Sequence, residues 1–174
     1  HSSFQPDGQP PFSSSAVKAN TKVQTPKGEF VPAEVPRPLT EADIKNVVRD
    51  YKEAALRARE AGFDGVEVHA ANGYLIEQFL KDGVNQRTDK YGGSVENRGR
   101  LLFEIIEAVT TVYPSTQVGV RMSPLEPVFD TNDSDPVKHY TYFINKPNDY
   151  NLAYLHLIEP AKGPKSTSTF RSVY

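Results

Sequence analysis

Three side chains that can polarise a carbonyl group and supply a proton lie close together in this sequence: His69, Asn72 and Tyr74. They follow the apolar run Val66-Glu67-Val68, which is typical of a buried strand, so we expect them where that strand leaves the core. When negative charge develops on a carbonyl oxygen, a neutral imidazole and an amide can both donate hydrogen bonds to it. A phenol has an ordinary pKa of about 10, so it stays protonated at neutral pH and can supply the proton.

Each of these residues also has a structural interpretation. His69 could be a core histidine that donates to a backbone carbonyl, and Tyr74 could pack at the rim of a sheet. Asn72-Gly73 is a common turn sequence, although a turn is compatible with a role in a site. Because a single short motif is weak evidence, it is the spacing of all three residues that favours a shared site.

The elements that must position these residues are predicted to be alternating helices and strands. Thr40 and Asp43 form an imperfect capping box at the start of a helix that Gly62 should end, and residues 63–69 follow as a short strand. The helix has one apolar stripe, which consists of Ile44, Val47, Val48, Tyr51, Ala55 and Ala58.

The same order of helix and strand then recurs. Ser94 can cap a second helix, which Pro114 should end before a strand at residues 117–122. A third, weaker unit combines a helix at residues 136–146 with a strand at residues 154–158. The buried face of the second helix is predicted to contain Leu101, Leu102, Ile105, Ile106 and Val109. Near-continuous apolar strands that alternate with helices predict a parallel sheet covered on both faces.

Polar residues end the three predicted strands: His69, Arg121 and Glu159. In a (β/α) barrel the carboxyl ends of the strands carry the chemistry, and no Gly-x-Gly-x-x-Gly follows any strand, which disfavours a dinucleotide-binding sheet. We therefore predict an α/β fold of the TIM-barrel class. Residues 1–39 are interpreted as an irregular loop and surface hairpin that turns at Pro26-Lys27-Gly28, and residues 40–174 as the βα units of the same single domain.

Composition restricts the classes of partner. The chain has 174 residues, of which 37% are hydrophobic and 24% are charged, with a formal net charge of -2; these values are typical of a globular protein. There is no basic stripe and no run of roughly 18 to 20 apolar residues, so we expect neither nucleic acid nor a membrane as a partner. The lack of cysteine excludes disulfides and thiolate metal sites and fits a cytoplasmic protein. Because the chain begins with His1, it is expected to be incomplete at that end.

Four stretches of the chain resemble the Old Yellow Enzyme family of flavin-dependent ene-reductases, which includes plant 12-oxophytodienoate reductases. They are, in order, SSFQPDGQPPFSSSA, AGFDGVEVHAANGYLIEQFLKDGVNQRTDKYGGSVENRGR, VGVRMSP and YLHLIEP. The resemblance implies a (β/α)₈ barrel that binds FMN and reduces the activated C=C bond of α,β-unsaturated carbonyl or nitro compounds with electrons from NADPH. It also implies that this chain covers only a central part of the barrel, because a full barrel usually needs about 250 residues.

Residue by residue, the resemblance implies roles for four positions. His69 and Asn72 would hydrogen-bond the carbonyl or nitro oxygen of a small-molecule substrate, and Tyr74 would donate a proton to the carbon α to that group. Arg121 would approach the N1/O2 edge of the flavin, although an ion pair with Glu159 is the structural alternative. The competing function is that of a truncated, non-catalytic fragment or a pseudoenzyme that lacks the FMN phosphate site.

Other charged residues are interpreted as structural. Glu67 is expected to be a buried carboxylate that needs a partner. His139 and His156 show no ligand partners at metal spacing, so no metal site is predicted. A network that fixes the long loop is expected from Asp89, Glu96, Asn97, Arg98 and Arg100. The sequence does not choose between NADPH and NADH, and it does not set the oligomeric state.

Overall fold

Three parallel strands and the helices that pack on them form the main body of this chain. The structure is a computed structural model that describes the backbone of residues 1–174 and every side chain except that of Asp130. In chain order, the elements are η1 (Ser2–Phe4), β1 (Phe12–Ser13), β2 (Lys22–Gln24), β3 (Phe30–Pro32), β4 (Arg37–Pro38), α1 (Glu41–Glu60), β5 (Val66–Ala70), α2 (Leu75–Leu80), α3 (Val95–Thr110), η2 (Ser115–Gln117), β6 (Val118–Met122), η3 (Val128–Asp130), α4 (Pro136–Asn145), η4 (Lys146–Tyr150), β7 (Tyr154–Leu157) and α5 (Ser166–Phe170).

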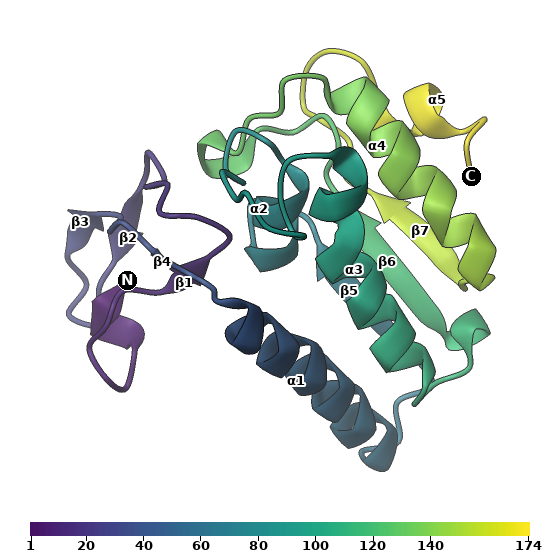
Figure 1. The fold of residues 1–174 in the computed structure, drawn as a ribbon, viewed down its shortest axis with the longest axis horizontal. Coiled ribbons are helices and arrows are strands. Elements are labelled where there is room, and N and C mark those ends of the chain that lie inside the picture. Colours follow the sequence, from purple (N-terminus) through teal and green to yellow (C-terminus); the bar gives the residue numbers. More distant parts are fainter.

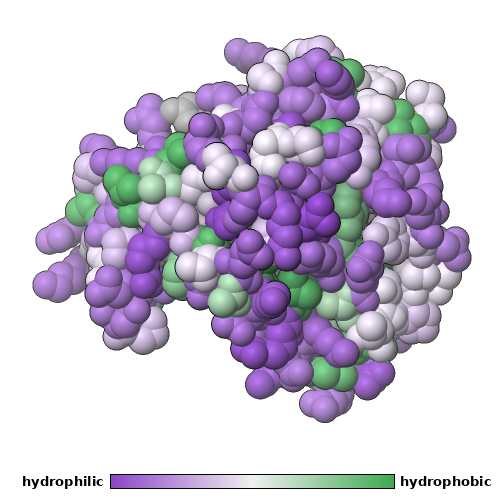
Figure 2. Space-filling view, in the orientation of Figure 1, coloured by the Kyte–Doolittle hydropathy of each residue, from purple (hydrophilic) through white to green (hydrophobic). Residues whose placement is uncertain are grey.

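The strands β5, β6 and β7 form one parallel sheet in that order. Figure 1 shows α1, α3 and α4 along one side of this sheet, and α3 packs against both of the others. In the same view, the outward surface of these helices is mainly hydrophilic (Figure 2), as expected for helices that bury one face only. Within the described chain, no helix has both the length and the apolar character needed to cross a membrane.

The sheet has one apolar and one polar face, because alternate side chains of a strand point in opposite directions. On the polar face, His69 is in register with Arg121, and Arg121 with His156, so these three form one row. Glu67 and Tyr154 are exposed on the same face, so this face of the sheet is polar and not apolar as on the helix side. The apolar face packs against the helices and contains Val68, Ala70, Val118, Val120, Met122, Leu155 and Leu157.

The prediction that Glu67 is buried is wrong. Its Oε2 atom lies 3.0 Å from Nδ1 of His156 on the polar face of the sheet. Gly119 stands between Glu67 and Tyr154 in the register, and a Cβ atom at Gly119 would overlap the ring of Tyr154. The missing side chain at Gly119 therefore lets the Tyr154 ring lie across β6.

The helices begin at the predicted capping residues. Thr40 Oγ1 accepts a hydrogen bond from Asp43 N (3.2 Å), and Asp43 Oδ2 accepts one from Thr40 N (2.9 Å), so the capping box of α1 is confirmed. Gly62, with a φ of +87°, lies just beyond α1, where a left-handed residue commonly ends a helix. Ser94 Oγ accepts a hydrogen bond from Asn97 N at the start of α3 (3.3 Å). All five residues predicted for the inner face of α3 are buried.

Two predicted boundaries differ from the structure by more than one residue. The second helix, α3, ends at Thr110, before Pro114 is reached. The residue that precedes a proline disfavours helical geometry, and Tyr113 packs into the core instead. The strand predicted to begin at residue 63 begins at Val66 instead. Phe63 lies outside the sheet and is 65% exposed.

The N-terminal segment packs beside α2, a short helix that was not predicted because it is too brief to show an apolar repeat. The strands β2 and β3 form an antiparallel hairpin, and β1 pairs with β4 in parallel. Arg87 Nη1 donates to the carbonyls of Ser14 (3.0 Å) and Leu39 (2.6 Å), and Ser14 Oγ donates to Gln78 O (2.6 Å). These bonds hold the N-terminal segment next to the loop that carries Tyr74.

Replacing Thr40 with alanine removes the acceptor for Asp43 N–H, so we expect the free energy of unfolding to fall by about 1 kcal/mol. Urea denaturation at neutral pH measures this change. Thr40→Ser keeps the hydroxyl group and is the matched control, which should stay close to the original protein. Equal losses in both variants would show that the methyl group, and not the cap, is responsible.

Candidate active site

Two of the predicted site residues lie side by side at the carboxyl end of β5. His69 is the fourth residue of β5, and Tyr74 immediately precedes α2. Their ring centroids are 5.4 Å apart, with the ring planes tilted by 50°. Tyr74 is 55% exposed, and His69 and Asn72 are half-buried, so none of the three is sealed in the core.

The loop between β5 and α2 contains two consecutive residues in the left-handed region, Asn72 (φ +59°) and Gly73 (φ +74°). Glycine adopts this conformation freely, and asparagine tolerates it better than most residues. A Cβ atom on Gly73 would lie 3.0 Å from Val128 O and 3.1 Å from the ring of Phe129, so a side chain here would be tightly packed as well as strained by the positive φ. The Asn72-Gly73 pair thus forms the turn that places Tyr74 beside His69.

Backbone hydrogen bonds hold this loop to the end of β6. Asn72 N donates to Ser123 Oγ (2.8 Å), and Gly73 N donates to Glu77 Oε2 (2.5 Å). Ser123 directly follows β6, so the loop is tied to the strand that carries Arg121. Neither Ser123 nor Glu77 was identified from the sequence as a partner of this loop. The spacing of four residues between Gly73 and Glu77, about one helical turn, is the sequence feature that indicates their contact.

The polar ends of the three side chains have no hydrogen-bond partner among the described residues. This holds for the ring nitrogens of His69, the amide of Asn72 and the hydroxyl of Tyr74, although the backbone of the same loop is well bonded. The alternative of a core histidine requires a bond from His69 to a backbone carbonyl, and the described chain contains none. All three groups are therefore able to donate hydrogen bonds to a ligand at this rim.

Arg121 lies next to His69 across the register of β5 and β6. Its Nε atom is buried without a hydrogen-bond partner in the described part of the chain, whereas nearly all buried donors in native structures have one. The alternative partner, Glu159, instead accepts hydrogen bonds from the backbone N–H groups of Ser166 (2.8 Å) and Thr167 (2.9 Å). Arg121 therefore has a buried donor that is available to an acceptor on a ligand.

A cavity of about 430 Å³ lies between the N-terminal segment and the Tyr74 loop. The rings of Tyr74 and Phe129 line it and meet edge to face, with their centroids 6.4 Å apart. Of the four predicted site residues, the cavity reaches Tyr74 and not the others. The opposite wall of the cavity was not predicted, because residues 1–39 were interpreted as an irregular loop and surface hairpin. This wall includes Pro11, Phe12, Val17 and Val23.

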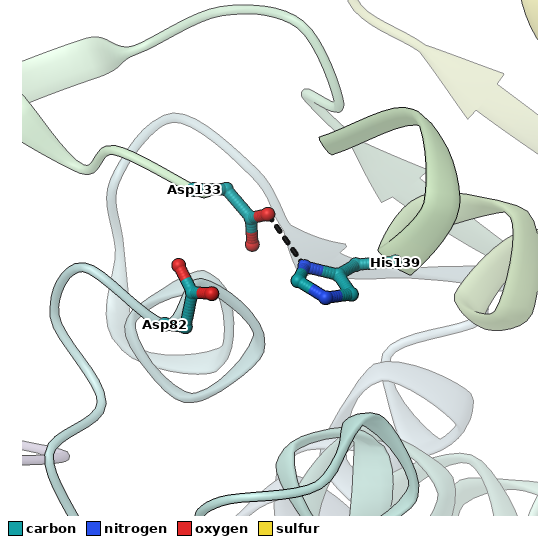
Figure 3. A group of neighbouring side chains, drawn as sticks. All are labelled: Asp82, Asp133 and His139. Carbon is teal, nitrogen blue, oxygen red and sulfur yellow. Dashed lines mark hydrogen bonds and ion pairs between the residues drawn. The ribbon is translucent and has the colours of Figure 1, made fainter. Parts of the chain in front are cut away.

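A second group of polar side chains brings together Asp82, Asp133 and His139 (Figure 3). His139 Nδ1 lies 2.6 Å from Asp133 Oδ1, and Arg98 Nη1 lies 3.3 Å from Asp133 Oδ2. Asp82 accepts hydrogen bonds from the backbone and the hydroxyl group of Ser134. The sequence showed no partners for His139 at metal-ligand spacing, but in the structure Asp133 lies beside it and Asp82, which is distant in the sequence, joins them. Since Arg98 already balances the charge of the buried Asp133, we interpret the group as an ion-pair cluster that joins α3 to the start of α4.

The chain matches the model of the NADH:flavin oxidoreductase / NADH oxidase family over residues 4–173. It is 47% identical over 154 residues to the flavin oxidoreductase hxnT of Emericella nidulans, a match that covers 86% of this chain and 37% of that protein. It is 42% identical over 167 residues to 12-oxophytodienoate reductase 7 of Oryza sativa subsp. japonica, which covers 92% of this chain and 42% of that protein.

Solved structures give the same result. Morphinone reductase in complex with tetrahydroNAD superposes with a TM-score of 0.92 at 41% identity, over 100% of this chain and 50% of that chain. The old yellow enzyme homologue from Zymomonas mobilis superposes with a TM-score of 0.90 at 36% identity, over 97% of this chain and 49% of that chain. The chain therefore spans about half the length of these structures. It belongs to the NADH:flavin oxidoreductase / NADH oxidase family, that of Old Yellow Enzyme, and its βα units form part of a TIM (β/α)₈ barrel.

Proposed function

We propose that this chain is part of an FMN-dependent oxidoreductase that reduces the activated C=C bond of α,β-unsaturated carbonyl or nitro compounds. The observation that carries the proposal is the pairing of His69 and Tyr74 at the carboxyl end of a parallel strand, where their polar atoms have no partner among the described residues. The names of two similar proteins, a 12-oxophytodienoate reductase and morphinone reductase, support the same chemistry.

Arg121 is the residue whose environment fits the flavin. Its buried Nε atom needs an acceptor, and the N1/O2 edge of FMN offers acceptor atoms beside which a cation is favourable. FMN, when bound, supplies the electrons that reduce the substrate. Because Arg121 and His69 are neighbours in the register, one rim of the sheet would hold both the cofactor edge and the substrate oxygen.

His69 and Asn72 would bind the substrate oxygen. The strand fixes the backbone of His69, and the left-handed turn fixes that of Asn72, which would hold both donors in position before charge develops. Removing one such donor from an active site typically costs about 2.7 to 4 kcal/mol of transition-state stabilisation. Neither group has to transfer a proton in order to act in this way.

Tyr74 would supply the proton to the carbon α to the activating group. Its ring is bounded by His69 and Phe129, with centroid distances of 5.4 and 6.4 Å, which restricts where its hydroxyl can lie. Because the side chain is largely exposed, water can return the proton after each turnover. The cavity beside Tyr74 would accept the part of the substrate that lies beyond the double bond.

NADPH is proposed as the electron source. A nicotinamide nucleotide is supported by the family description and by the tetrahydroNAD complex of morphinone reductase. Anaerobic reduction of the FMN-loaded protein, measured side by side with NADPH and NADH, tests the choice between them. Faster reduction by NADH at equal concentration would contradict this part of the proposal.

Titration with FMN tests the cofactor. We expect the flavin absorption bands to shift on binding, and we expect Arg121→Met to weaken FMN binding about tenfold or more, since it removes a hydrogen bond from a charged group. Arg121→Lys is the matched control that keeps the charge and should bind better than Arg121→Met. Protein that binds no FMN would instead support the non-catalytic alternative.

Replacing Tyr74 with phenylalanine should slow the oxidation of the reduced protein by an enone about 100-fold or more, because a positioned general acid contributes about 10² to 10⁴ in rate. Reduction of the protein by NADPH should remain nearly unchanged, since no proton passes through Tyr74 in that half-reaction. Stopped-flow absorbance in the flavin bands measures each half separately. Equal losses in both halves would refute the role of proton donor.

Replacing both His69 and Asn72 with alanine should abolish the long-wavelength absorption band that forms when a phenol stacks on the flavin. The expected cause is the loss of both donors to the phenolate oxygen. Tyr74→Phe is the control, because it leaves these two donors in place and should retain the band. A band that persists in the double variant would place the anion site elsewhere.

A further inference from the structure

We propose that Glu77 is a positioning residue, whose buried carboxylate holds the backbone of the Asn72–Tyr74 loop so that Tyr74 stands over the substrate. The inference rests on the proposed function for the role of Tyr74. Glu77 does not itself line the cavity or the rim, because its side chain is fully buried. Its effect on the reaction would therefore pass through the loop.

The carboxylate of Glu77 is surrounded by donors. Its Oε2 accepts a hydrogen bond from Gly73 N (2.5 Å), and its Oε1 accepts from Ser123 Oγ (2.5 Å) and from Tyr140 OH (2.9 Å). The ammonium group of Lys81, itself buried, lies 3.5 Å from Oε1. A carboxylate with this many donors is fully satisfied in the core, which is the condition for keeping a charge there.

These bonds act directly on the loop backbone. Gly73 N is held by Glu77 itself, and Asn72 N is held through Ser123, whose Oγ accepts from Asn72 N (2.8 Å) and donates to Glu77. The carboxylate therefore accepts from Gly73 N directly and orients the hydroxyl that accepts from Asn72 N, and so it stabilises the turn that places Tyr74.

The same carboxylate connects two neighbouring βα units. Ser123 follows β6, Tyr140 belongs to α4, and Lys81 follows α2 and donates to Glu126 O (2.9 Å). Burial raises the pKa of Tyr140 well above its usual value, with a further contribution from Glu77, so its hydroxyl remains a donor. The position of Tyr74 relative to Arg121 on β6 is thereby set by one buried carboxylate, and misplacement by about 1 Å can cost about 100-fold in rate.

The test uses Glu77→Gln in the FMN-loaded protein. An amide has nearly the same size but only one oxygen, so it cannot accept hydrogen bonds on both sides. We expect hydrogen exchange of the Gly73 amide to become at least tenfold faster, and oxidation by an enone to slow at least tenfold at saturating substrate. Glu104→Gln is the matched control, because Glu104 also accepts from a tyrosine hydroxyl, that of Tyr91 (2.9 Å), at a distance in sequence from the loop. It should change neither readout.

A double-variant cycle separates positioning from general damage. If Glu77 acts through Tyr74, adding Glu77→Gln to Tyr74→Phe should cause little further loss in the oxidative half-reaction. An equal loss in both backgrounds, or unchanged Gly73 exchange in Glu77→Gln, would overturn the inference. A different outcome is that Tyr74→Phe alone has no kinetic effect while hydrogen exchange at Gly73 is still faster in Glu77→Gln. That result would refute the proposed role of Tyr74 but would support the stabilisation of the loop by Glu77.

Ser123→Ala provides a second variant in case Glu77→Gln does not fold. It leaves the Glu77–Lys81 pair intact and removes both the acceptor for Asn72 N and the hydroxyl that donates to Glu77 Oε1. We expect faster exchange at the Asn72 amide and a smaller, non-additive loss in the same cycle with Tyr74→Phe. Protection of the Asn72 amide equal to that in the original protein would contradict the relay through Ser123.

Discussion

The parallel register of β5, β6 and β7 is the constraint on which the rest of this structure depends. It brings His69, Arg121 and His156 into one row, although more than thirty residues separate each from the next in the sequence. The register is set by the apolar face, because a shift of one residue would turn Val68 and Val120 away from the helices and expose them. Packing against α1, α3 and α4 thus determines which polar side chains meet at the rim.

The row of polar residues on the strands does not form the site by itself. The loop after β5 must also take an unfavourable backbone conformation. Two consecutive left-handed residues persist only where the surrounding structure holds them. Here that structure is the buried pair of Glu77 and Lys81 together with Ser123. Hydrogen bonds from Asn72 N and Gly73 N hold the backbone of the loop, whereas the side chain of Tyr74, which follows them, is exposed.

Local features of this chain could be read from the sequence, whereas long-range polar contacts could not. The capping box of Thr40 and Asp43 and the inner face of α3 follow from residues a few positions apart, and both agree with the structure. The barrel class followed from the order of helices and strands and from the resemblance to Old Yellow Enzyme. The exposure of Glu67 was missed because a strand pattern does not reveal which of its faces is covered. The approach of Asp82 to Asp133 and His139 and the partners of Glu77 were missed because they depend on how separate segments pack.

The bond between Gly73 and Glu77 also bears on the chemical durability of the protein. An Asn-Gly sequence is prone to deamidation, in which the glycine nitrogen attacks the asparagine side chain and closes a five-membered imide. Here Gly73 N donates a hydrogen bond to the buried carboxylate of Glu77 and lies in a turn of fixed geometry, which opposes ring closure. Ageing should therefore convert Asn72 to aspartate more slowly in the native state than in the unfolded chain, a difference that peptide mass spectrometry would detect.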